Sequence, residues 1–200
     1  MILFVASAKR ICLLMSDWKT LDGIDIENIY AAIRNEVKKV DDGGGIVFAY
    51  IGTDGQNLGK KSTSFVQCVA LHKFDENGIG KGGRVFFVRH LEKPYVNRKQ
   101  RLLREAELSI NLAQKLEPLF SELDIPFEVH ADVNSVAGKN KQNKSFEVHD
   151  TIKGWIESMG WVCKTKPQAF VASIVADRHT RSIRSGKNHF RKQVNRRKGV

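Results

Sequence analysis

The chain has 200 residues, 42% of them hydrophobic and 28% charged, a composition typical of one soluble globular domain with its own core. No apolar run reaches the roughly 18 to 20 residues of a membrane-spanning helix. Cys12, Cys68 and Cys163 are widely spaced and form no C-x-x-C pair, which argues against a disulfide framework or a structural zinc site. We therefore expect a cytoplasmic protein whose cysteines are small buried hydrophobes.

The net charge of +11 is spread unevenly along the chain. Nine of the 33 Lys and Arg residues lie between Arg178 and Val200, where there is no Asp or Glu. The preceding 177 residues therefore hold 24 basic and 22 acidic residues. A basic arm of this kind favours salt-sensitive binding to nucleic acid phosphates. The alternative is a disordered tail that only aids solubility.

The N-terminal segment, 1–44, is predicted to hold one amphipathic helix. Its opening makes a poor signal peptide because the apolar stretch precedes Lys9 and Arg10, and residues 1–14 form a mis-assigned extension if Met15 is the true start. Residues 25–40 have apolar side chains at helical spacing, with Asp25 as the expected cap, and the helix should end at the glycines that follow.

Three strands are predicted next, at 45–54, 64–75 and 83–93, and their short connections favour an antiparallel meander. A long helix follows at about 97–123, in which Pro118 is expected to kink or end the last turn. Residues 125–134 alternate as a strand, and a helix at 146–160, a short strand at 161–166 and a last helix from about 167 complete the order. This order predicts a three-layer α/β fold with a mixed sheet.

Four acids occupy notable positions in these elements. Asp54 and Asp132 are expected at the ends of strands, where sites in such sheets are commonly built. Glu105 lies about 60° from the apolar stripe of the long helix, so it should border the sheet, whereas Glu107 should face solvent. Asp177 belongs to the apolar last helix. None of the four has an evident counter-charge nearby in the sequence.

Acids at the edge of apolar faces are costly unless a partner compensates their charge, and a divalent cation is a natural partner. Ligands that are all oxygen favour magnesium or manganese over zinc. Two such ions could activate water for phosphodiester cleavage. The alternative is that these are ordinary surface acids chosen from the 22 in the chain.

The sequence also resembles the ribonuclease H-like YkuK family of bacteria and their phages. The resemblance is carried by YIGTDGQ at 50–56, RLLREAELS at 101–109, VHADVN at 129–134 and, most specifically, WIESMGWVCKTKPQAFVASIVADRHTR at 155–181. It covers roughly 45–181, predicted as the ribonuclease H-like domain, and leaves 182–200 as a basic tail.

The resemblance implies a ribonuclease H-like fold with a five-stranded mixed sheet. It also implies a nuclease site that takes one acid each from the first strand, the first long helix, the fourth strand and the last helix. Those positions match Asp54, Glu105, Asp132 and Asp177. In two respects the match is incomplete: Gly55 stands where the family's GTDSQ has Ser, and not every member need retain an acid at the position of Asp177.

Other residues are weighed as accessory groups. His179 could protonate a leaving group or be a solvated histidine, and His130 could orient Asp132 or be structural. Candidate contacts to nucleic acid phosphates come from the loop after Asp132, from the short strand at 161–166 and from the tail, namely Lys139, Lys141, Lys164, Lys166, Arg181 and Arg184.

Three functions are consistent with these residues. The first is a nuclease for RNA, DNA or a hybrid that uses Mg²⁺ or Mn²⁺. The second is a nucleic-acid-binding protein on the same scaffold without catalysis, and the third, less favoured, is an actin-like nucleotide-binding module. The segment GQNLGKKS does not match a P-loop, because it has three residues between its glycines where that motif has four.

Overall fold

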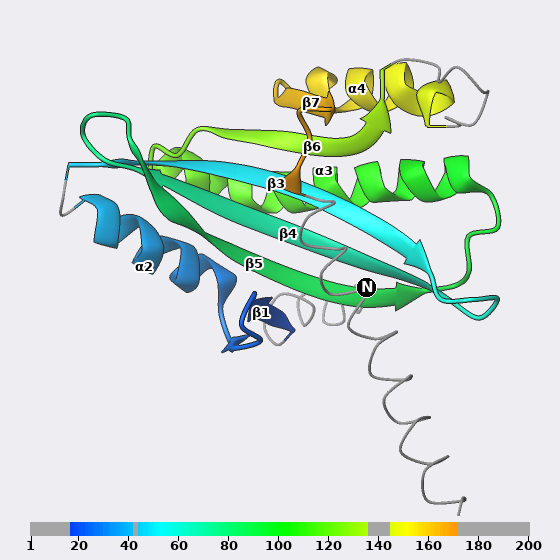
Figure 1. Cartoon of the computed structure of the whole chain (residues 1–200), viewed down its shortest axis with the longest axis horizontal. Coiled ribbons are helices and arrows are strands. Elements are labelled where there is room, and N and C mark those ends of the chain that lie inside the picture. Colours follow the sequence, from blue (N-terminus) through cyan, green and yellow to red (C-terminus); the bar gives the residue numbers. More distant parts are fainter. Residues whose placement is uncertain (1–16, 42–43, 136–144, 172–200) are drawn as a thin grey trace, which may run out of the picture.

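The computed structural model describes residues 17–41, 44–135 and 145–171. Its centre is a seven-stranded mixed sheet in the order β2-β1-β5-β4-β3-β6-β7 (Figure 1). The strands are β1 (Trp18–Thr20), β2 (Asp25–Ile26), β3 (Ile46–Asn57), β4 (Thr63–Phe74), β5 (Gly80–Glu92), β6 (Phe127–Asn134) and β7 (Val162–Lys166).

The five predicted strands are all present with the expected topology. Strands β3, β4 and β5 form an antiparallel meander, and β6 and β7 continue the sheet in parallel with β3. The predicted count of five was wrong, because β1 and β2 extend the sheet beyond β5. These strands are only three and two residues long, too short for an alternating pattern to reveal.

The helices are α2 (Ile29–Asp41), α3 (Arg98–Glu122) and α4 (His149–Ser158), the last preceded by the 3₁₀ turn η2 (Phe146–Val148). The cap of α2 is Asn28, whose side chain accepts hydrogen bonds from the N–H groups of Tyr30 and Ala31. The predicted cap, Asp25, instead lies in β2 and pairs with Lys19. Helix α3 continues through Pro118 for one more turn and does not end there.

One main core lies between the helices and one face of the sheet. Apolar residues of α2, α3 and α4 pack there against alternate residues of β3 and β6, including Ile51, Val129 and Val133. The opposite face of the sheet has a smaller apolar cluster, Val66, Cys68, Phe87 and Val171. Strand β3 is therefore central and apolar on both faces, as its sequence predicted. The predicted last helix lies almost entirely outside the described residues.

Strand β3 is longer than predicted. It continues three residues past Asp54 to Asn57, and the hairpin to β4 closes with a hydrogen bond from Leu58 N to Ser62 O of 2.8 Å. Asp54 is thus inside a strand, and the hairpin loop is 58–62. The reason is the partner strand: β4 supplies paired residues as far as Asn57, although Gly55 disfavours a strand locally.

Two of the three cysteines, Cys68 and Cys163, lie in the described residues. Cys68 and Cys163 are buried and not disulfide-bonded, as expected, and burial raises the pKa of Cys68 to about 12 and that of Cys163 to about 11. Cys12 lies outside the described residues. Within the described ranges, no helix is both long and apolar enough to cross a bilayer.

Candidate active site

Three of the four predicted acids come together at one end of the sheet. Asp54 on β3 and Asp132 on β6 each lie two residues beyond the last registered pair of these parallel strands, Gly52 and His130. Glu105, on α3, is only 5% exposed. Its pKa is raised well above the usual value, first by burial and then by the negative charge of Asp54, with a smaller contribution from Asp132. The negative charges of Asp54 and Asp132 therefore both act on Glu105.

Gly55 gives the Glu105 carboxylate its place beside β3. The N–H of Gly55 donates a hydrogen bond of 3.1 Å to Glu105 Oε1. A Cβ at position 55 would lie 2.8 Å from that oxygen and 2.7 Å from the ring of Phe65. A serine at position 55 would therefore force the Glu105 carboxylate or the Phe65 ring to move. This close packing explains why a glycine fits this position. Glu107, by contrast, faces outward and pairs with Arg104 at 2.9 Å, as its helical position predicted.

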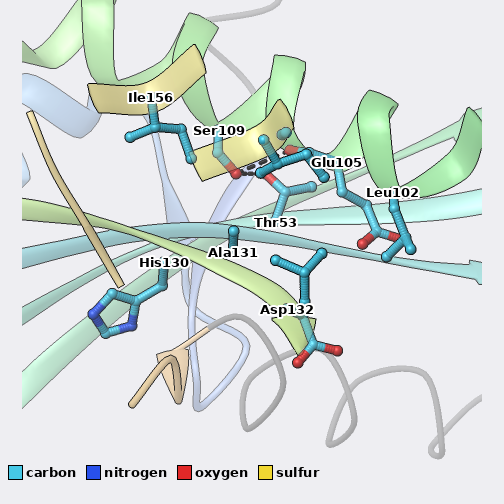
Figure 2. A pocket seen from close by; sticks show the side chains of 11 residues that line it. Thr53, Leu102, Glu105, Ser109, His130, Ala131, Asp132 and Ile156 are labelled. Carbon is cyan, nitrogen blue, oxygen red and sulfur yellow. Dashed lines mark hydrogen bonds between the residues drawn. The ribbon is translucent and has the colours of Figure 1, made fainter. Parts of the chain in front are cut away.

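A buried pair of hydroxyls fixes α3 to β3 next to this carboxylate (Figure 2). Ser109 Oγ lies 2.9 Å from Thr53 Oγ1 and 3.0 Å from the backbone oxygen of Glu105. Both side chains line a cavity of about 10 Å³ that is also lined by Glu105 and Asp132. These hydroxyls were not singled out from the sequence, although Ser109 is a polar residue on the apolar face of a helix.

Two of the acids have cationic partners, contrary to the sequence-based expectation. Arg101 Nε lies 3.3 Å from Glu105 Oε1, and Lys166 Nζ lies 2.7 Å from Asp132 Oδ1. The Asp132 oxygen is buried but has no partner in hydrogen-bond geometry, so Lys166 neutralises its charge without saturating it. The i, i+4 spacing of Arg101 and Glu105 was visible in the sequence. The pairing of Lys166 with Asp132 depends on the β6–β7 register and was not.

His130 is a buried structural residue on the same sheet face as Asp132. Its Nε2 lies 2.9 Å from Glu128 Oε1, and its Nδ1 accepts from the N–H groups of Phe170 and Val171 at 3.4 Å each. Burial is the main cause that lowers the pKa of His130, so the ring is neutral near pH 7. It anchors the segment that leads toward Asp177.

The remaining predicted residues divide into two groups. Lys164 lies on β7, paired in register with His130 of β6. Outside the described residues lie Asp177, His179, Lys139, Lys141, Arg181 and Arg184. Within the described ranges, no group of three or more His, Cys, Asp or Glu side chains has an arrangement that could hold a metal ion.

Comparison with known families fits this geometry. Residues 28–181 match the family model described as Ribonuclease H-like. The chain belongs to this family, the YkuK family. No curated protein and no solved structure matches the chain. The mixed α/β sheet with acids on its central strands is consistent with the ribonuclease H-like fold, and membership of the family indicates a function connected with nucleic acids.

Proposed function

We propose that the protein is a nuclease that hydrolyses phosphodiester bonds in RNA, DNA or a hybrid with divalent metal ions. Asp54, Glu105 and Asp132, with Asp177, would hold magnesium or manganese. The observation that carries the proposal is the environment of Glu105, which is buried and repelled by the charges of Asp54 and Asp132. A bound cation beside Glu105 would offset this repulsion between the negative charges.

The donor set fits such ions. All the candidate ligands are carboxylate oxygens, which Mg²⁺ and Mn²⁺ prefer. Asp132 Oδ1 is a buried oxygen that pairs with Lys166 but accepts no hydrogen bond of good geometry within the described residues. Bound metal ions would supply an activated water and would stabilise the leaving oxygen.

The chain's own residues orient the acids for this task. The Gly55 N–H and the Thr53–Ser109 contact hold the Glu105 side chain and its helix turn against β3. Lys166 and Arg101 balance the charges of two acids and are partly exposed, so they can also reach phosphates of a bound strand.

Two observations favour a second function, nucleic-acid binding without catalysis. Arg101 and Lys166 already neutralise two of the acids, and the described acids form no metal-binding group. In that case the acids and their cations would be a buried polar network that stabilises the site, and the protein would bind nucleic acid without turnover.

Cleavage assays on matched variants separate the two functions. We expect the wild-type protein to cut RNA, DNA or hybrid substrates with Mg²⁺ or Mn²⁺, and Asp54→Asn or Asp132→Asn to lower the rate on the order of 10²-fold or more. The control is Asp22→Asn, the same change at an exposed position remote from the acids, which should leave the rate unchanged. If the wild-type protein binds all three substrates but cuts none with either metal, the nuclease proposal fails.

A further inference from the structure

Four exposed cations gather at the end of the sheet that holds the acids. Lys60 and Lys61 lie in the β3–β4 hairpin loop, Lys93 follows β5, and Arg98 begins α3. We call these four residues the basic rim. Figure 1 shows the hairpin and the β5–α3 connection at the same end of the sheet, away from α2. We propose that the basic rim is a docking surface for the phosphate backbone of a nucleic acid strand.

Hydrogen bonds hold the two loops of the basic rim together. Thr63 Oγ1 donates to Asn57 Oδ1 at 2.7 Å and accepts from Tyr95 N at 3.0 Å, and Asn57 Nδ2 donates to Tyr95 O at 2.9 Å. The Asn97 side chain caps α3 by accepting from Lys99 N at 2.8 Å. The backbone that carries the four cations is therefore ordered before any ligand binds, which lowers the entropic cost of docking.

The charge of the basic rim is not balanced by neighbouring acids. None of its four side chains has an ion-pair partner in the described part of the chain, whereas most other described cations do, such as Lys73 with Glu36. The nearby Glu92 is neutralised by Arg104, at 2.6 Å, and bonded to the Tyr95 hydroxyl. Four uncompensated cations at one end of the sheet create a positive electrostatic field that attracts a polyanion.

The first turn of α3 strengthens this field. It contains no acid and begins with Arg98, unpaired within the described residues, although the amino end of a helix dipole disfavours cations; the charge of the following Lys99 is balanced by Glu147. Sequence choices that break a local rule are expected at functional sites. An anion at this end would be attracted both by the side chains and by the helix dipole.

The basic rim is close enough to the acids to share one bound strand with them. Arg98 precedes Glu105 by seven residues, about 10 Å along a helix. Asp54 precedes the end of β3 by three residues, again about 10 Å. A strand whose scissile phosphate lies at the acids would thus place neighbouring phosphates at the basic rim, and in this respect the inference rests on the proposed function.

Matched double variants test the docking surface in the full-length chain. We would measure affinity for labelled single-stranded RNA, single-stranded DNA and an RNA–DNA hybrid over a series of salt concentrations in EDTA. Lys60→Gln/Lys61→Gln and Lys93→Gln/Arg98→Gln each remove two charges from the basic rim. The control Lys38→Gln/Lys115→Gln removes two exposed cations that also lack a described acid partner, on α2 and the distal half of α3.

Each rim variant should weaken binding, by roughly three- to tenfold at moderate salt, and reduce the slope of log affinity against log salt by about one to two. The control should change neither beyond twofold. Equal losses in all three variants would show that net charge alone matters, and unchanged binding in the rim variants would equally overturn the inference. EDTA removes the metal ions, so the binding assay does not depend on cleavage. If the rim variants weaken binding but the wild-type protein cuts no substrate with either metal, the docking surface stands and only the nuclease proposal fails.

Discussion

At the scale of single residues, Glu105 has the most unusual environment among the candidate acids. It is 5% exposed, and its partners act in opposite directions: Asp54 and Asp132 raise its pKa, while Arg101 and the Gly55 N–H lower it. Burial and the two acids prevail. Without metal, the folded protein therefore keeps the Glu105 proton at a pH where the unfolded chain has lost it.

The consequence is a pH-dependent stability. Because the folded-state pKa of Glu105 lies above the usual 4.5, its contribution is fully present below pH 4.5 and is lost as pH rises through the folded-state value. In EDTA, wild-type stability should therefore decline with rising pH relative to Glu105→Gln, which mimics the protonated acid. Urea unfolding of both proteins between pH 4.5 and 8.5 measures the difference.

The comparison must be made as a difference between the two proteins, since His130 acts in the opposite sense. Burial lowers the pKa of His130 below 6.5, so its contribution is lost as pH falls through the folded-state value. That effect is common to both proteins and cancels. Parallel stability curves would show that Glu105 is ionised in the fold at neutral pH.

At the scale of elements, the contact between α3 and β3 places Glu105. Ser109→Ala leaves the buried Thr53 hydroxyl without its partner, which should cost about 1–3 kcal/mol in free energy of unfolding. Thr53→Val should cost less, because the Ser109 hydroxyl can still donate to the backbone oxygen of Glu105. In the double variant both hydroxyls are gone, so its cost should be less than the sum of the single costs.

A denaturation series on the wild type, both single variants and the double variant measures this coupling. The control is Ser158→Ala at the exposed end of α4, where the hydroxyl bonds only to Trp155 O and the change should cost within about 0.5 kcal/mol. Additive costs for Thr53 and Ser109 would mean that their contact does not hold α3 against β3.

Helices and strands with a clear hydrophobic periodicity could be predicted from the sequence, whereas contacts between these elements could not. The long apolar stripe of α3 located the helix to within a residue at each end and separated Glu105 from Glu107. The end of β3 was wrong because pairing with β4 carries the strand past a glycine. Asp54, Glu105 and Asp132 lie on the strands and the helix that the sequence predicted, but the pairing of Lys166 with Asp132 depends on a β6–β7 register that periodicity cannot supply.

At the scale of the whole molecule, charge is divided between a nearly balanced body and a cationic C-terminal segment. Truncation is a poor test of that segment because it also changes chain length. We would instead replace the seven Lys and Arg residues after Arg181 with Gln and keep the length. The basic rim and the candidate acids remain unchanged in this variant.

Nucleic acid binding by the Gln variant should weaken, and its salt slope should fall by up to about five for single strands, since each lost phosphate contact removes roughly 0.7. Maximal cleavage at saturating substrate should stay within a few-fold of wild type, because general attraction to phosphates raises affinity without changing the reacting groups. Fluorescence anisotropy over a salt series and single-turnover cleavage measure the two quantities. An unchanged salt slope would show that these seven cations do not contact phosphates.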